Sequence, residues 1–223
     1  MKPRAHSAVF LAVSFSLLFA TFVALAVAAH SPLLLQLDVS VSRWVQGFRS
    51  GWLDGVATAV TLLGNTLPLI VFGIVAAALL FRSGHWWAAG LSAAIAPLTL
   101  SLNGLLKALV GRPRPDEGLV YVLLSPAGLG FPSGHALVPT VFYGFLALLV
   151  GRLLPPGRGR RLAVILLAAV PVATGLSRVY LGVHWFSDVL AGWAGGLLLL
   201  LLLALLYHRV APAEVSGLQK RAP

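Results

Sequence analysis

The chain of 223 residues contains no cysteine and few charged residues. Without cysteine, neither a disulfide framework nor a thiolate metal site is available. Only 10% of the residues are charged, and the six acidic residues are too scattered to form a convincing magnesium cage. The sequence also lacks dinucleotide-binding, P-loop and zinc patterns. We therefore predict neither a cofactor nor a bound metal.

Apolar residues, in contrast, make up 59% of the chain, and its mean hydropathy is +0.94. Soluble domains are about 45–50% apolar, and a membrane-spanning helix needs roughly 20 apolar residues. Six runs meet this need: 8–29, 56–81, 86–110, 134–154, 162–183 and 184–207. We predict an all-α fold, a polytopic membrane protein with six transmembrane helices in one domain over residues 1–223. The first run is about twice as long as a usual signal-peptide core, which favours an uncleaved anchor over a cleaved signal.

The distribution of basic residues predicts the orientation in the membrane. An even number of spans places both termini on one side, where ten of the 16 basic residues lie with the single acid Glu214. The ten are Lys2, Arg4, Arg82, Arg152, Arg158, Arg160, Arg161, Arg209, Lys220 and Arg221. The positive-inside rule then predicts cytoplasmic termini, with residues 1–7 and 211–223 as flexible tails. The net charge of +10 does not indicate nucleic-acid binding, because the basic residues lie between apolar runs.

Residues 30–55 combine charged residues with Trp44 and Trp52. Tryptophan favours the boundary between lipid and water. We interpret this stretch as an amphipathic helix at the membrane surface, and a lid over a functional site is the alternative.

His184 and Asp188 are four residues apart, so on a helix their side chains lie on the same face. A carboxylate there can accept a hydrogen bond from one ring nitrogen and leave the other nitrogen as a nucleophile or base. The alternative is a buried pair that only fixes the helix in place.

Ser133, Gly134 and His135 follow Pro132 at the predicted start of the fourth span. Serine is a favoured N-cap, and the first amides of a helix form an anion site that glycine lets a ligand approach closely. An imidazole one turn inside could give a proton to a leaving oxygen. The alternative is an ordinary helix start.

Lys107, Arg114 and Arg178 are the cations that the predicted topology places beside these two histidines. Each alone could be an interfacial anchor. Together they provide the bidentate forks and the point charge that suit a phosphate, whose transfer requires chiefly positioning and neutralisation of charge. The predicted site therefore faces the periplasm or exterior and binds a phosphate.

Other polar residues are expected to have structural roles. The remaining histidines lie at predicted span ends, and Arg112 and Asp116 are expected to order the loop before Ser133. Asn65, Thr66 and Asn103 lie at or within spans, where polar groups are costly unless paired. We expect Asn103 to take part in packing between helices, and support of Lys107, one turn further along, is the alternative.

Three motifs occur in order along the chain: Lys107-x6-Arg114-Pro115, Pro132-Ser133-Gly134-His135 and Ser177-Arg178-x5-His184-x3-Asp188. In order, spacing and residue type, this set resembles the signature of the type 2 phosphatidic acid phosphatase (PAP2) family. The motifs span residues 107–188, and the six predicted spans extend the resemblance over most of the chain.

The resemblance implies a metal-independent phosphatase that works through a phosphohistidine. His184 would attack phosphorus, Asp188 would orient it, and His135 would protonate the leaving oxygen and then activate water. The phosphate would be held by the amides of residues 133–135 and by Lys107, Arg114, Ser133, Gly134 and Arg178.

The implied substrate is a lipid phosphate whose tail stays in the bilayer, at the outer face of a cell membrane. Undecaprenyl pyrophosphate, phosphatidylglycerol phosphate and phosphatidic acid all fit. One alternative is a lipid phosphotransferase with the same intermediate. Another is a non-catalytic membrane protein that binds or moves phospholipids, and a third is a hydrolase with Ser133 as nucleophile. Six spans argue against a soluble vanadate-dependent haloperoxidase, which shares these motifs. The sequence does not predict an oligomeric state.

Overall fold

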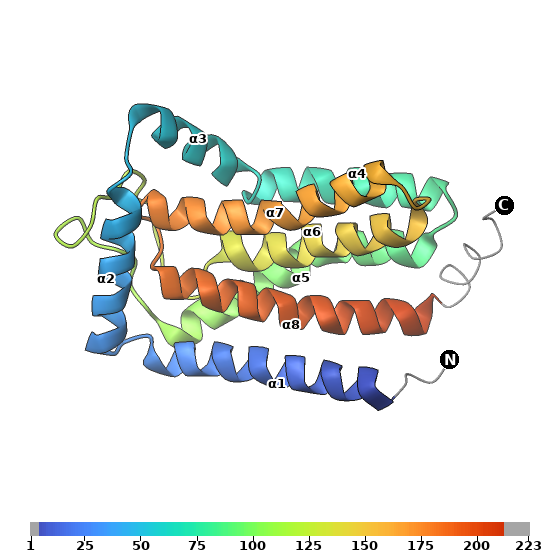
Figure 1. The fold of residues 1–223 in the computed structure, drawn as a ribbon, viewed down its shortest axis with the longest axis horizontal. Coiled ribbons are helices and arrows are strands. Elements are labelled where there is room, and N and C mark those ends of the chain that lie inside the picture. Colours follow the sequence, from blue (N-terminus) through green and yellow to red (C-terminus); the bar gives the residue numbers. More distant parts are fainter. Residues whose placement is uncertain (1–4, 212–223) are drawn as a thin grey trace.

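The computed structural model describes residues 5–211 and contains eight α-helices and no strand in that range (Figure 1). The helices are α1 (Ala5–Ala28), α2 (Pro32–Gln46), α3 (Gly51–Leu62), α4 (Thr66–Arg82), α5 (Trp86–Val110), α6 (Gly134–Leu153), α7 (Arg158–Tyr180) and α8 (Phe186–Val210). The predicted all-α class is confirmed. Because α1 already begins at Ala5, residues 5–7 of the predicted flexible tail are helical. Residues 1–4 and 212–223, on which the rest of the predicted tails falls, lie outside the described residues.

Five helices, α1, α5, α6, α7 and α8, are long and apolar enough to cross a membrane. Helices α3 and α4 meet this test only as a pair and are bent by 48° at the break between them, so the described chain has up to six spans. The prediction of one continuous helix over 56–81 was wrong. Asn65 has an extended backbone, with φ −71° and ψ 150°, and it starts α4 as a new helix.

Helix α6 is the centre of the bundle, and α5, α7 and α8 pack around it (Figure 1). More than half of its apolar window is buried, whereas α1 buries none of its own. Glycines allow α8 to approach α6 closely, because a Cβ at Gly196 would lie 2.7 Å from Thr140 Cβ. Small residues of this kind are typical of helix contacts in membranes. The exposed faces of the outer helices carry large apolar side chains, as expected next to lipid.

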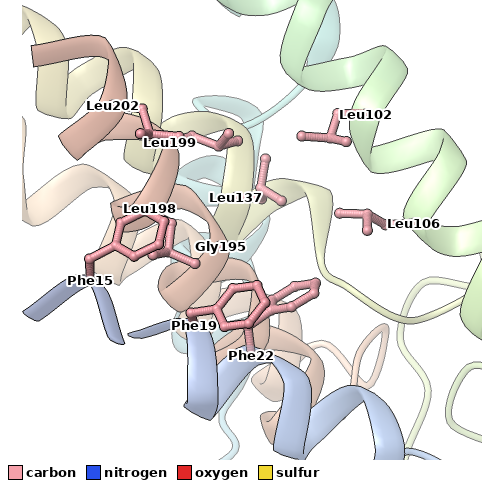
Figure 2. A pocket seen from close by; sticks show the side chains of 10 residues that line it. All are labelled: Phe15, Phe19, Phe22, Leu102, Leu106, Leu137, Gly195, Leu198, Leu199 and Leu202. Atoms are coloured by element: carbon pink, nitrogen blue, oxygen red, sulfur yellow. The ribbon is translucent and has the colours of Figure 1, made fainter. Parts of the chain in front are cut away.

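A groove of about 230 Å³ lies between α1, α5 and α8, as Figure 2 shows. Phe15, Phe19 and Phe22 of α1 line one side, and leucines of α5 and α8 line the other. The lining contains no polar side chain, so the groove accommodates hydrocarbon and provides no chemistry of its own.

Helix α2 lies across one end of the bundle, opposite the end at which α8 finishes (Figure 1). The side chains of Trp44 and Trp52, within the predicted surface stretch, are exposed. On the other face of α2, Asp38 and Ser42 are buried. The Gln46 amide donates to the carbonyls of Tyr121 and Tyr180, which attaches α2 to the loop after α5 and to α7.

Candidate active site

The three motifs meet at the end of the bundle that α2 covers, where α5 and α7 end and α6 and α8 begin (Figure 1). Lys107 lies in the last turn of α5, and Arg178 in the last turn of α7. The loop 111–133 brings Arg114 and Ser133, and α6 begins with Gly134 and His135. His184 lies in the turn before α8, and Asp188 lies in the first turn of that helix. The structure therefore brings all eight predicted site residues to one end of the bundle, whereas their sequence positions span 107–188.

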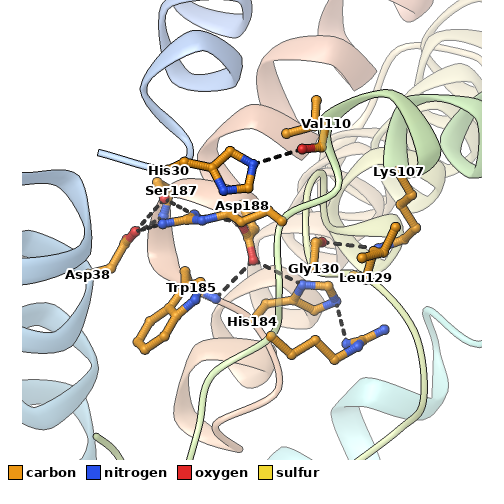
Figure 3. A network of polar contacts seen from close by, with 12 residues as sticks. His30, Asp38, Lys107, Val110, Leu129, Gly130, His184, Trp185, Ser187 and Asp188 are labelled. Atoms are coloured by element: carbon orange, nitrogen blue, oxygen red, sulfur yellow. Dashed lines mark hydrogen bonds and ion pairs between the residues drawn. The ribbon is translucent and has the colours of Figure 1, made fainter. Parts of the chain in front are cut away.

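The imidazole of His184 is held between a carboxylate and a guanidinium (Figure 3). Its Nδ1 lies 3.3 Å from Asp188 Oδ2, and its Nε2 lies 3.2 Å from Arg114 Nη1. A guanidinium can only donate hydrogen bonds, so Nε2 is the acceptor and the proton of the neutral ring is on Nδ1. This tautomer leaves a nucleophilic lone pair on Nε2, directed toward a cation.

Burial and nearby cations determine the charge state of His184. The side chain is almost completely buried, and burial lowers its pKa well below the usual value. Arg114, Lys107 and Arg178 lower this pKa further through electrostatic repulsion of a second positive charge. Burial also lowers the pKa of Arg114, which nevertheless remains a cation. At neutral pH His184 is therefore a neutral imidazole.

Ser133 occupies the N-cap position of α6, but its hydroxyl makes no capping bond and has no partner, although the residue is fully buried. Its backbone amide donates to the carbonyl of Asp188 at 3.0 Å. The expectation that this amide helps to hold a phosphate is therefore wrong, because the amide joins α6 to α8. The amides of Gly134 and His135, in the first turn, have no acceptor within the helix and remain suited to an anion.

Arg178 and Asn103 also carry buried polar atoms without a partner. The guanidinium of Arg178 donates from Nη1 to Thr61 Oγ1 at 2.8 Å, whereas its Nε has no acceptor. Buried polar atoms nearly always have partners, so such exceptions indicate a ligand or water. The unpaired donors of Ser133 and Arg178 fit an anion. Asn103 Oδ1 is an acceptor, and a Cβ at Gly134 would lie 3.0 Å from Asn103 Nδ2, so Asn103 packs against the start of α6 as expected.

Lys107 is more strongly engaged than the sequence indicated. Its ammonium group donates to the carbonyls of Leu129 and Gly130, at 2.5 and 3.0 Å (Figure 3). These bonds attach the loop 111–133 to α5. An ammonium has three donors, so one remains for a phosphate oxygen.

Arg112 and Asp38, which the sequence analysis did not place in the site, form a buried network with Asp188. Arg112 Nη1 donates to Asp188 Oδ1 at 2.7 Å, and Arg112 Nη2 donates to Asp38 Oδ2 at 2.8 Å. Asp38 in turn accepts from the amide and the hydroxyl of Ser187. Arg112 and Asp38 are 2% exposed and Asp188 is fully buried, so these charges are paired away from water. The one feature of the sequence that could have indicated this contact is Asp38, an acidic residue in the middle of the surface helix.

The remaining histidines fit the structural roles expected of them where their contacts are seen. His30 Nε2 bonds to the carbonyl of Val110 at 2.8 Å and joins α1 to α5, and His208 contacts Arg152 (Figure 3). Among the described residues, no group of three or more histidines and acids is arranged to hold a metal ion. The electrostatic character of the site therefore comes from Lys107, Arg114 and Arg178.

Comparison with known proteins agrees with this geometry. The model of the PAP2 superfamily matches residues 85–211, more than half of the chain, and this range contains all three motifs. The chain belongs to the PAP2 superfamily. The resemblance inferred from the motifs is thus confirmed.

Three similar proteins are each named as a phosphatase. Phosphatidylglycerophosphatase B of Bacillus subtilis is 34% identical over 189 residues, which cover 83% of this chain and 90% of that protein. Decaprenylphosphoryl-5-phosphoribose phosphatase of Mycobacterium tuberculosis is 40% identical over 129 residues, covering 57% of this chain and 64% of that protein. Lipid A 1-phosphatase of Rhizobium etli is 37% identical over 115 residues, covering 48% of this chain and 45% of that protein.

A solved structure is also similar. The transmembrane PAP2-type phosphatidylglycerolphosphate phosphatase from Bacillus subtilis matches with a TM-score of 0.78 and 32% identity, over 88% of this chain and 97% of that one. The multi-pass membrane fold of this PAP2 protein is confirmed, and the names of its relatives support an enzyme of the phosphatase class.

We expect Arg112→Leu to destabilise the protein, because it leaves the buried carboxylates of Asp38 and Asp188 without their cation. Removing one partner of a buried ionic group costs about 3–5 kcal/mol. For a chain of this size, that corresponds to a fall in Tm of roughly 10 °C, measured on detergent-purified protein. Arg43→Leu is the matched control, because the Arg43 side chain donates to the Leu119 carbonyl at an exposed position. An equal fall in both variants would contradict this role of Arg112.

We also expect His184 to make stability dependent on pH. The pKa of His184 is lowered in the folded protein. Below about pH 6.5 this side chain therefore binds a proton in the unfolded chain but not in the folded protein. The stability of the wild type relative to His184→Asn, which cannot titrate at that position, should therefore decrease as pH falls from 7.5 to 5. The decrease is at most about 1.4 kcal/mol per pH unit. Tm of both proteins measured across this range tests the expectation, and a difference that is independent of pH would contradict it.

Proposed function

We propose that this PAP2 protein is a metal-independent lipid phosphatase that acts through a phosphohistidine on His184. The observation that carries the proposal is the pair of contacts of this imidazole: Nδ1 lies against Asp188, and the unprotonated Nε2 accepts from Arg114. This is the arrangement required for a nitrogen that attacks an anionic phosphorus centre. The cation that now contacts Nε2 would bind the oxygens of the phosphoryl group in the complex.

In the first step, Nε2 of His184 attacks phosphorus, and the bond between phosphorus and the lipid oxygen breaks. The imidazolium of His135 gives its proton to the departing oxygen, so the lipid alcohol leaves uncharged. In the second step, neutral His135 takes a proton from water while the water oxygen attacks phosphorus. The bond between phosphorus and nitrogen breaks, phosphate is released, and both histidines return to their initial states.

The phosphoryl oxygens would be held by Lys107, Arg114 and Arg178, together with the hydroxyl of Ser133. The amides of Gly134 and His135 at the start of α6 would complete the cradle. Support comes from the unpaired buried donors of Ser133 and Arg178, since an anion would satisfy both. Such donors contribute most where charge develops in a site that excludes water.

The proposed substrate class is a lipid carrying a phosphomonoester or a diphosphate. The membrane fold would keep the tail of such a lipid in the bilayer while its head group reaches the site. Phosphatidylglycerol phosphate is the first candidate to test, because a relative that aligns with most of this chain is named for it. Undecaprenyl pyrophosphate and phosphatidic acid fit the same chemistry.

The geometry favours this chemistry over Ser133 as the nucleophile of a triad. Ser133 Oγ has no hydrogen-bond partner, and His184 Nε2, which would be its base, accepts from Arg114 instead. Three cations near the site also provide nothing that an acyl substrate needs. A lipid phosphotransferase would use the same first step, and it differs only in the acceptor of the second.

We expect purified protein in EDTA to release phosphate from a panel of lipid phosphates, and His184→Ala to release at least about 1,000-fold less. Loss of the nucleophile removes the covalent route. The panel holds phosphatidylglycerol phosphate, phosphatidic acid and undecaprenyl pyrophosphate, and His85→Ala, far from the site, is the control. Inhibition by EDTA would contradict metal independence.

The same experiment separates the alternative functions. Transfer of phosphate to an added alcohol in place of water would indicate a phosphotransferase. Complete loss of activity in Ser133→Ala would indicate the serine hydrolase, because phosphate chemistry at His184 predicts only a partial loss in that variant. Binding of lipid phosphates without turnover by folded protein would indicate a non-catalytic lipid-binding protein.

We further propose that the termini are cytoplasmic and that the site faces the periplasm or exterior, as the distribution of basic residues predicts. The natural absence of cysteine makes this testable with single introduced thiols. Phe48→Cys, at an exposed position between α2 and α3, should react with a membrane-impermeant maleimide added to intact cells. Gly157→Cys, between α6 and α7, should react only after the membrane is opened. The reverse pattern would invert the orientation.

A further inference from the structure

The break between α3 and α4 lies directly against His135. His135 Nε2 is 2.8 Å from Asn65 Oδ1, and a Cβ at Gly64 would lie 2.8 Å from His135 Cδ2. Any larger side chain at position 64 would therefore displace the ring. Two turns along α6, the hydroxyl of Tyr143 donates to the carbonyl of Leu63 at 3.0 Å. The break is thus fixed to α6 at two points, and one of them is the imidazole.

The side chain of Asn65 contacts His135 in place of capping its own helix. Asparagine is among the best N-caps, and a side-chain capping bond stabilises a helix. Asn65 is the N-cap residue of α4, yet its side chain makes no capping bond. Helix α4 therefore lacks the stabilisation that a capping bond from Asn65 would give, because this side chain contacts the imidazole.

We propose that Asn65 is a positioning residue for proton transfer by His135. This inference rests on the proposed phosphatase function. An imidazolium can only donate hydrogen bonds, so the amide oxygen is the end of Asn65 that fits the acid form of His135. The same oxygen keeps the proton on Nε2 when the ring is neutral. In both half-reactions, Nδ1 is therefore the nitrogen that exchanges a proton, first with the leaving oxygen and then with water.

The two histidines of the site thus have partners of different charge. His184, the nucleophile, is held by the carboxylate of Asp188. A carboxylate stabilises an imidazolium and so makes it a weaker acid. His135 must give its proton away, and the uncharged amide of Asn65 orients the ring without this effect. The carboxylate partner therefore suits the nucleophile His184, and the amide partner suits the acid His135.

The test uses two substrates that differ in one atom: dioctanoyl phosphatidic acid, and its analogue with sulfur in place of the bridging ester oxygen. A thiolate leaves without protonation, because thiols are far stronger acids than alcohols. The quantity measured is kcat/KM, which covers binding and the first chemical step but not release of phosphate from the enzyme. General acid catalysis contributes about 10²–10⁴-fold. We expect Asn65→Ala to lower kcat/KM by about 10–100-fold for the oxygen ester, and by less than about threefold for the sulfur ester.

Three variants complete the design. Asn65→Asp keeps an acceptor oxygen but adds a negative charge that makes the imidazolium a weaker acid, so it should restore only part of the activity on the oxygen ester. His135→Ala should show the same selective loss as Asn65→Ala, but larger. Thr66→Ala, at the exposed neighbouring position, should leave both substrates unaffected.

An equal loss on both esters in Asn65→Ala would show a merely structural role and overturn the inference. So would unchanged activity on the oxygen ester. If the wild type releases phosphate from neither ester nor from any other lipid phosphate, the proposed function fails and the inference fails with it. A selective loss in Asn65→Ala supports both.

Discussion

The buried charges of Asp38, Arg112 and Asp188 are the constraint on which the rest of the site depends. In a protein with so few charges, three of them are placed out of contact with water, where each needs an oppositely charged partner. Arg112 makes this possible because its planar fork binds both carboxylates at once. The result fixes the position of Asp188 and, through it, the ring of His184. It also holds α2, the helix that covers the site, to the start of α8.

The order of these contacts explains why the loop 111–133 has a defined path in spite of its length. Arg112 anchors its beginning to two carboxylates, and Lys107 binds the carbonyls of Leu129 and Gly130 near its end. Gly130 passes so close to Asp188 that a Cβ there would lie 2.9 Å from the carboxylate. The amide of Ser133 then joins the loop to α8. Each attachment uses a polar group that belongs to the site or borders it, so the contacts that fix the path of the loop also position the groups of the site.

Predictions from the sequence were most accurate where the physical signal is local. Long apolar runs identified the spanning helices, because backbone groups in lipid must be satisfied within a helix. The contact between His184 and Asp188 was predicted correctly, but not its origin: His184 lies in the turn before α8, and Asp188 contacts it from the first turn of that helix. The continuous second span was a wrong prediction, because Gly64 and Asn65 were not recognised as a break in an apolar run. Hydropathy alone does not register where a helix stops and restarts.

The sequence by itself determined the membrane fold class and the three motifs that carry the resemblance to the PAP2 family. These follow from composition, periodicity and residue type, which are properties of short segments. Only the tertiary structure decided which groups surround the two histidines: Asp38 and Arg112 behind Asp188, Thr61 on Arg178, and Asn65 on His135. These partners are about 70 to 120 residues apart in the chain. A contact between such distant residues produces no periodic pattern in the sequence, because it depends on how the helices pack against one another and not on the residue pattern within one helix.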